Sequence, residues 1–208
     1  FSAGRGNAAG GGRGRGATGR GGGGGSVNWS PDSKSFYATR RDTRNIQELY
    51  LVNALSEPRP TLRSYDYPMP GEDAIRKSEL YVFHPERKEL LRVIPKWKDE
   101  TYSQISWRDG TDTLRFMRRD RLLRNAEYVE YDIRTGDAKV LLSEGFEAAY
   151  LDMQPVRYLD DTDEIIWWSE RSGWGHFYLY SKDGELKNAI TSGPFRASSI
   201  VEVDEDNR

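Results

Sequence analysis

The 208-residue chain carries 31 Lys and Arg against 33 Asp and Glu, and 36% of its residues are hydrophobic. That composition suits a soluble, partly exposed fold. The chain has no cysteine, which excludes disulfides, thiolate metal sites and cysteine nucleophiles. No stretch approaches the roughly 18 to 20 apolar residues of a membrane span, and no signal peptide is recognisable.

Residues 1–26 are predicted to be a flexible, Gly/Arg-rich segment. Residues 1–25 hold 13 of the 21 glycines, four arginines and no acid. Such a segment has no apolar face to bury, and its glycines would lose much conformational entropy on ordering. RNA binding through phosphate charge and guanidinium stacking is the functional alternative. It is a distant one, because no aromatic residue beyond Phe1 is interleaved with the arginines.

From residue 27 onward the chain repeats a strand, a turn and a second strand. Segments 27–42, 105–120 and 156–171 align without a gap, with Trp29 and Trp107 in the same place. The predicted turns are 30–33, 108–111 and 160–163. An apolar spacing of 3.6 residues persists almost nowhere, so β structure is the economical interpretation.

Two further strands are expected in each unit. They are the hairpin 78–93 in the first unit, 126–133 and 138–143 in the second, and 176–181 and 185–192 in the third. Four antiparallel strands in roughly 40 to 50 residues are typical of a β-propeller blade. We therefore predict an all-β fold, a partial β-propeller of about three blades plus a stub. Its parts are blade 27–94, blade 103–143, blade 152–192 and stub 197–203.

The first blade contains an insertion at about 49–77. Its prolines, at 58, 60, 68 and 70, have no backbone N–H to donate, so the insertion is not expected to form a central strand of a sheet. Its apolar surface comes from Leu62, Tyr65, Tyr67 and Met69. A protruding arm or an edge extension is expected. Because each blade exposes an apolar face that only neighbouring blades can cover, three blades and a stub predict part of a larger propeller.

No catalytic residue or cofactor site is predicted within the chain. The G-x-S-x-G motif of serine hydrolases does not occur, and His84 and His176 have no nucleophile beside them in the pattern. Two separated histidines offer no metal-ligand spacing. The acidic run 160–164 lacks the glycine and terminal glutamate of a calcium loop, so a hairpin turn explains it better.

Aromatic and basic residues recur at equivalent places in the units. The tryptophans are expected to pack between blades, with sugar or ligand stacking as the alternative; they are Trp29, Trp107, Trp167, Trp168 and Trp174. The pair Arg40-Arg41 and its copy Arg118-Arg119 end the second strand of their blades. They are expected to form ion pairs with the aspartate that follows each pair, or else to contact an acidic partner.

Two runs, 29–72 and 167–193, resemble the N-terminal propeller of the dipeptidyl peptidase IV family of serine peptidases, in particular its bacterial members. The more specific is S-E-x-x-G-W-x-H-x-Y-L-Y followed by N-x-I-T-x-G, and the likeness covers about 27–203. The resemblance implies an eight-bladed propeller capping an α/β-hydrolase domain. The catalytic Ser, Asp and His of that family lie in the hydrolase domain, beyond the end of this sequence.

The resemblance also implies what this chain does. It would be the non-catalytic propeller portion of a serine exopeptidase, gating and positioning peptide substrates, with the C-terminal α/β-hydrolase domain and the peptide as partners. A homodimer and a periplasmic or extracellular location in a bacterium are expected. The alternative is a stand-alone interaction propeller without peptidase activity.

One substrate contact is transferred by the resemblance. In segment 145–155, Tyr150 stands where the family directs an aromatic toward the substrate, but Ala149 and Leu151 occupy the places of flanking arginines. An ordinary tyrosine packed between blades remains the alternative for Tyr150. The glutamate pair that holds a peptide N-terminus in the family is absent from this sequence, so either it lies upstream of Phe1 or the substrate rule differs.

Overall fold

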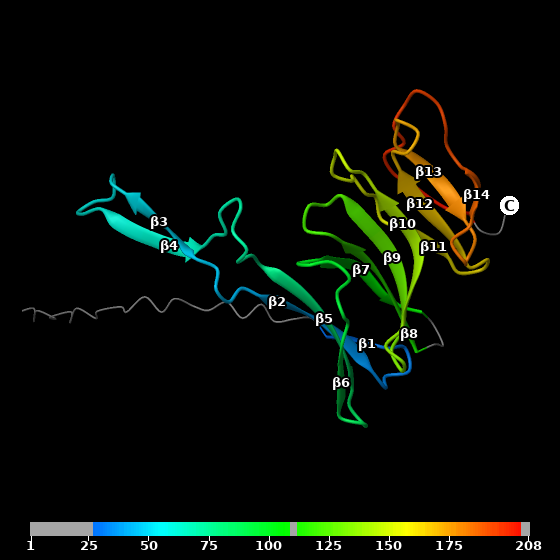
Figure 1. Cartoon of the computed structure of the whole chain (residues 1–208), viewed down its shortest axis with the longest axis horizontal. Helices are drawn as coiled ribbons and strands as arrows, with labels where there is room; N and C mark the ends of the chain where they lie inside the picture. Colours follow the sequence, from blue (N-terminus) through cyan, green and yellow to red (C-terminus); the bar gives the residue numbers. More distant parts are fainter. Residues whose placement is uncertain (1–26, 109–111, 205–208) are drawn as a thin grey trace, which may run out of the picture.

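The computed structural model describes residues 27–108 and 112–204. Within these residues there are fourteen strands and no helix, arranged as three four-stranded antiparallel sheets and one two-stranded hairpin. Figure 1 shows the three sheets side by side and the hairpin extending away from them. The all-β, partial propeller prediction is confirmed. The Gly/Arg-rich segment 1–26 and most of the predicted turn 108–111 lie outside the described residues.

Each four-stranded sheet is one blade. Blade 1 has the order β1 (Val27–Trp29), β2 (Phe36–Asp42), β5 (Lys77–His84) and β6 (Glu89–Arg92). Blade 2 contains β7 (Thr101–Trp107), β8 (Thr113–Arg119), β9 (Asn125–Asp132) and β10 (Ala138–Gly145). Blade 3 contains β11 (Arg157–Leu159), β12 (Glu164–Ser169), β13 (His176–Tyr180) and β14 (Leu186–Ala189). In blades 2 and 3 every strand pairs with its neighbour in sequence, as up-and-down blades require.

The first tight turn follows the chemistry of its residues. The hydroxyl of Ser30 donates to Asp32 Oδ1 at 2.7 Å, and the amide of Lys34 donates to the same oxygen at 3.1 Å. Ser33 takes a positive φ of 59°. Asp32 therefore organises the turn by bonding back to the backbone. Strand β2 begins after the turn, at Phe36, and continues to Asp42.

The cores lie between blades. One cluster joins β2 and β5 of blade 1 to β8 and β9 of blade 2, and a second joins blade 2 to blade 3. Phe116 belongs to the first cluster and Met117 to the second. Alternate side chains of β8 thus face opposite neighbours, which explains why five consecutive residues, Leu114 to Arg118, are buried.

Hydrogen bonds tie blade 1 to blade 2. Tyr37 Oη donates to the carbonyl of Ile105 at 2.9 Å, and Trp107 Nε1 donates to the carbonyl of Asn28 at 3.1 Å. His84 is buried, with Nδ1 2.6 Å from the hydroxyl of Ser35 and Nε2 3.4 Å from a carbonyl of blade 2. This histidine is a structural residue of the blade contact.

The outer face of blade 3 is covered by the segment 197–203. Trp168 and Phe177 are buried there against Ala197, Ile200 and Val203. Trp168 Nε1 donates to the carbonyl of Ala197 at 2.6 Å. The segment forms no strand, yet it lies against blade 3 where a following blade would pack.

The insertion of blade 1 is a hairpin that we call the arm. It consists of β3 (Glu48–Asn53) and β4 (Thr61–Asp66), paired in register and connected between β2 and β5. Figure 1 shows it projecting well beyond the blades. None of its residues belongs to a core cluster. Its exposed apolar side chains are Tyr50, Leu51, Val52, Leu55, Leu62 and Tyr65.

Candidate functional site

The connections at one end of the blades form the candidate site. Because neighbouring strands are antiparallel, the β8–β9, β10–β11 and β12–β13 connections emerge at the same end of blades 2 and 3. The arm leaves blade 1 at the equivalent β2–β5 connection. We call this end the loop rim. It carries Tyr150, the residue that the sequence singles out.

Tyr150 lies on a loop fastened at both ends. The Tyr150 loop, residues 146–151, follows β10. The amide of Phe146 donates to the carbonyl of Arg124 at 2.9 Å, and the amide of Leu151 donates to the carbonyl of Leu123 at 2.7 Å. Tyr150 is 70% exposed, whereas Leu151 is 2% exposed. The buried leucine anchors the loop, and the aromatic ring is presented to its surroundings.

Tyr150 is exposed, whereas the alternative role considered for it, packing between two blades, requires a buried ring. A tyrosine packed between blades would be buried, as Tyr128 and Tyr131 are in blade 2. Leu151, in contrast, is buried, so an arginine in its place would bring a charge into the core at considerable cost.

The loop rests on the β8–β9 turn, residues 120–124. Asp120 Oδ1 accepts the amides of Arg124 at 2.7 Å and Asn125 at 3.1 Å, and Asn125 Nδ2 donates to Asp120 Oδ2 at 2.7 Å. Burial acts to raise the pKa of Asp120, but the hydrogen bonds from Asn125 and Arg124 outweigh it, and the pKa lies below its ordinary value. A Cβ on Gly145 would lie 2.7 Å from Asn125 Oδ1, so glycine allows β10 to approach the turn.

Arg119 joins the β8 end to the Tyr150 loop. One of its terminal nitrogens donates to the carbonyl of Leu151, and its Nε is buried without a hydrogen-bond partner. Among the described residues, no carboxylate lies within 4.0 Å of this half-buried guanidinium. Burial lowers the pKa of Arg119, an effect that Asp152 and Asp120 partly oppose. The expected ion pair between Arg119 and Asp120 is therefore wrong; Asp120 is occupied in capping the turn.

Arg118 has a different partner from the expected one as well. It is buried and donates to Glu127 Oε2 from both Nε, at 2.9 Å, and Nη2, at 2.7 Å. Arg118 and Glu127 are directly opposite on β8 and β9. Lys96 contacts the other oxygen of this buried carboxylate. Two cations thus compensate the buried carboxylate.

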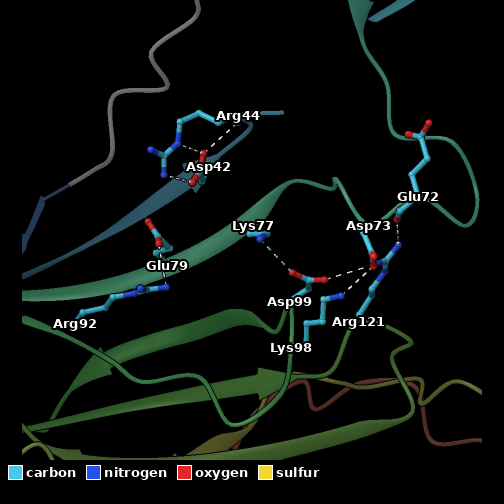
Figure 2. Close-up of polar contacts among 10 residues, drawn as sticks. All are labelled: Asp42, Arg44, Glu72, Asp73, Lys77, Glu79, Arg92, Lys98, Asp99 and Arg121. Carbon is cyan, nitrogen blue, oxygen red and sulfur yellow. Dashed lines mark hydrogen bonds and ion pairs between the residues drawn. The ribbon is translucent and has the colours of Figure 1, made fainter. Parts of the chain in front are cut away.

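The corresponding residues of blade 1 also pair differently from the prediction. Asp42 is bound by Arg44, at 2.8 Å from Nε and 2.6 Å from Nη2, and Figure 2 shows this pair. These hydrogen bonds lower the pKa of Asp42. Arg40 instead lies 3.7 Å from Glu79. Asp42 therefore pairs with Arg44, which follows it in the chain, and not with the preceding Arg40-Arg41 pair.

A charged cluster fixes the chain that returns from the arm. We call residues 72–77 the arm root. Arg121 Nη2 donates to the carbonyl of Glu72 at 2.6 Å, and Nη1 lies 3.5 Å from Asp99 Oδ2. Lys98 binds Asp73 at 2.9 Å. Figure 2 shows these side chains converging between blade 1 and blade 2. The arm root is thereby held against blade 2.

A shallow groove of about 430 Å³ lies on the loop rim of blade 3. Trp174, half exposed, and Tyr178 line it, together with His176. His176 is buried and has both ring nitrogens in contact, Nδ1 with Thr191 Oγ1 at 3.1 Å and Nε2 with the carbonyl of Gly193 at 3.0 Å. Those contacts assign it a structural role.

The tryptophans divide between buried and exposed positions. Trp107 and Trp167 pack in the clusters between blades, and Trp168 packs beneath the segment 197–203. The predicted packing between blades is confirmed for Trp107 and Trp167, whereas Trp168 is covered by a segment that forms no strand. Trp29 is 51% exposed, on the face of blade 1 that has no neighbouring blade among the described residues, and it stacks on Phe36 with ring centroids 5.0 Å apart.

Neither a metal cluster nor a membrane helix occurs in the part of the chain that the structure describes. No group of three or more His, Asp or Glu side chains there could hold a metal ion. In the acidic run 160–164, Asp163 accepts from Arg108 at 3.0 Å and from the hydroxyl of Tyr158. Residues 27–108 and 112–204 form strands and connections only, so they contain no helix that could span a membrane.

The stacked blades and their loop rim define this chain as part of a β-propeller domain. The family model for the dipeptidyl peptidase IV (DPP IV) N-terminal region matches residues 23–208. The chain belongs to this family.

Relatives and solved structures agree with that assignment. Dipeptidyl peptidase 4 of Arthroderma otae is 25% identical over 111 residues, covering 51% of this chain and 14% of the relative. The crystal structure of Porphyromonas gingivalis dipeptidyl peptidase 4 is similar in fold, with a TM-score of 0.73 and 23% identity, covering 86% of this chain and 26% of that one. A putative dipeptidyl aminopeptidase IV from Bacteroides ovatus gives a TM-score of 0.59 and 22% identity, covering 76% and 22%. This chain thus spans about a quarter or less of each protein.

Proposed function

We propose that this chain is the non-catalytic propeller portion of a dipeptidyl peptidase IV-like serine exopeptidase, which removes short peptides from the N-terminus of its substrates, often after proline. Its own work is to gate access and to position the peptide for an α/β-hydrolase domain that the present sequence does not include. The intact protein acts in the periplasm or outside a bacterial cell. Membership of the DPP IV N-terminal family supports this role.

The observation that carries the proposal is the position of Tyr150. Tyr150 is 70% exposed at the loop rim, while the adjacent Leu151 is buried and its amide donates to the carbonyl of Leu123. An exposed aromatic ring on a firmly held loop offers a large contact area at little entropic cost. In the proposed role this ring lies against the bound peptide.

Two measurements test the proposal. Reading the gene beyond Arg208 should reveal G-x-S-x-G in a strand-turn-helix context, followed by Asp and then His. A reading frame that ends soon after Arg208 would favour the stand-alone interaction propeller instead. The isolated chain should not cleave a Gly-Pro chromogenic substrate; turnover that a serine-directed inhibitor abolishes would mean that this chain contains an unrecognised nucleophile.

We also propose that the arm joins two copies of the intact protein in a homodimer. Leu55, Val52 and Leu62 are 92%, 67% and 65% exposed on a hairpin that contacts no core. A two-stranded hairpin is only marginally stable alone, and contiguous exposed apolar surface marks interaction sites. A second copy offers the matching apolar hairpin in a symmetric, self-complementary contact.

A further inference from the structure

The β8–β9 turn touches two features that are far apart in sequence. Figure 1 shows this turn at the loop rim of blade 2, at the junction with blade 1. On one side it contacts the arm root, residues 72–77, and on the other it carries the Tyr150 loop, residues 146–151. Both sets of contacts are made by the same short stretch of backbone.

The contact with the arm root depends on Arg121. Its guanidinium donates to the carbonyl of Glu72 at 2.6 Å and lies 3.5 Å from Asp99. The Asp99 side chain is 3% exposed, and Lys77 of the arm root lies 4.0 Å from it. Figure 2 shows Arg121 between the arm root and Asp99. A hydrogen bond from a charged donor to a backbone carbonyl is stronger than a neutral one.

The contact with the Tyr150 loop is made by the backbone of the next residues. The carbonyls of Leu123 and Arg124 accept the amides of Leu151 and Phe146. These bonds enclose Tyr150 between two fixed points. A displacement of the turn therefore displaces the loop as well.

The turn itself resists deformation. Asp120 closes it through two backbone amides and the side chain of Asn125. Leu123 takes a positive φ of 57°, a conformation that a leucine keeps only when its surroundings impose it. A stiff turn transmits position from one side to the other.

We propose that Arg121 is a positioning residue for Tyr150: by fixing the β8–β9 turn to the arm root, it sets where the Tyr150 loop stands on the loop rim. The inference rests on the proposed function, in which Tyr150 contacts the bound peptide. It assigns a role in substrate affinity to a residue on a different connection from Tyr150. It also links the arm mechanically to the substrate-facing loop.

The test compares Arg121→Gln with Arg134→Gln in the intact protein. Arg134 is an exposed arginine at the opposite end of blade 2, where it pairs with Asp112 at 3.2 Å, so the control removes the same charge from the same blade. Hydrogen exchange is followed in peptides covering 144–153, and KM and kcat are measured with a peptide that begins Gly-Pro.

For Arg121→Gln we expect about a tenfold rise both in exchange across 144–153 and in KM, with kcat within about twofold of the natural protein, as loss of one charge-assisted contact predicts. Arg121→Lys keeps the charge near Asp99 but not the fork that reaches Glu72, so its changes should be about threefold. Should the Gln variant not fold, the Lys variant alone makes the test. Arg134→Gln should change neither quantity.

The outcomes separate this inference from the proposed function. Unchanged exchange across 144–153 in both Arg121 variants would overturn the positioning role. Faster exchange with an unchanged KM would support the mechanical link but overturn the contact between Tyr150 and the peptide. A fall in kcat with an unchanged KM would also contradict a role for Arg121 in positioning the substrate.

Discussion

Gly184 offers a direct probe of how closely blade 2 and blade 3 fit. It lies in the β13–β14 turn with φ +86°, and a Cβ added there would lie 1.9 Å from the carbonyl oxygen of Leu141 in β10. Gly173, in the β12–β13 turn, has nearly the same φ of +88°, but apart from its two chain neighbours no described residue has an atom within 4 Å of its added Cβ. Alanine at either site meets the same backbone strain, and only Gly184→Ala forces the blades apart.

The loss of stability has two contributions, backbone strain at positive φ and overpacking against β10. A residue with a side chain at positive φ costs about 1 to 2 kcal/mol, and this applies to both variants. Overpacking against a neighbouring backbone costs about 1 to 3 kcal/mol more, and this applies to Gly184→Ala alone. Gly184→Ala should therefore lower the free energy of unfolding by about 1 to 3 kcal/mol more than Gly173→Ala does. It should melt at the lower temperature of the two, because a loss of stability lowers the melting temperature.

Differential scanning calorimetry of the intact protein, at one scan rate for both variants, gives the comparison. The Gly173 variant serves as the control because it isolates the strain at positive φ. Equal melting temperatures for the two alanine variants would refute the close packing of the β13–β14 turn on β10.

Three further predictions follow from the rim and the arm. Tyr150→Ala in the intact protein should raise KM for a Gly-Pro peptide about three- to tenfold, the worth of one aromatic contact; steady-state kinetics showing no change would contradict the contact. Val52→Glu combined with Leu62→Lys, which keeps a cross-strand attraction, should shift a homodimer toward monomer in sedimentation, whereas Leu90→Lys on β6 should not; a dimer that persists would exclude the arm. Asp120→Asn should lower the melting temperature at neutral pH, and because the folded pKa of Asp120 is depressed, the difference should persist above the ordinary value near 3.8 and vanish as the pH falls through the folded pKa; a difference that is unchanged at low pH would show that the carboxylate does not stabilise the turn.

The repeat in the sequence was enough to predict blades, because each copy places apolar residues and an aromatic at matching positions. The complete burial of β8 was harder to predict from the sequence. Its residues Leu114 to Arg118 are all buried, since the strand lies between two neighbours, and Arg118 is accommodated only by Glu127 directly across the sheet. The residue opposite Arg118 depends on the strand register, which the β8–β9 turn fixes, and that turn was not predicted from the sequence.

The candidate site was predicted only in part. Tyr150 was identified from a family resemblance. The structure adds that it is exposed and that two backbone hydrogen bonds hold its loop. The role of Arg121 could not be foreseen, because its contact with Glu72 joins residues 49 positions apart in sequence. The ion pairs expected for Asp42 and Asp120 failed for a local reason: short turns let an aspartate bind groups that follow it in the chain.

The decisive experiment is a crystal structure of the intact protein with a non-hydrolysable Gly-Pro peptide bound. We expect three consecutive blades that match residues 27–192, with the ring of Tyr150 in van der Waals contact with the peptide. A peptide bound away from the loop rim, with Tyr150 facing open solvent, would contradict it.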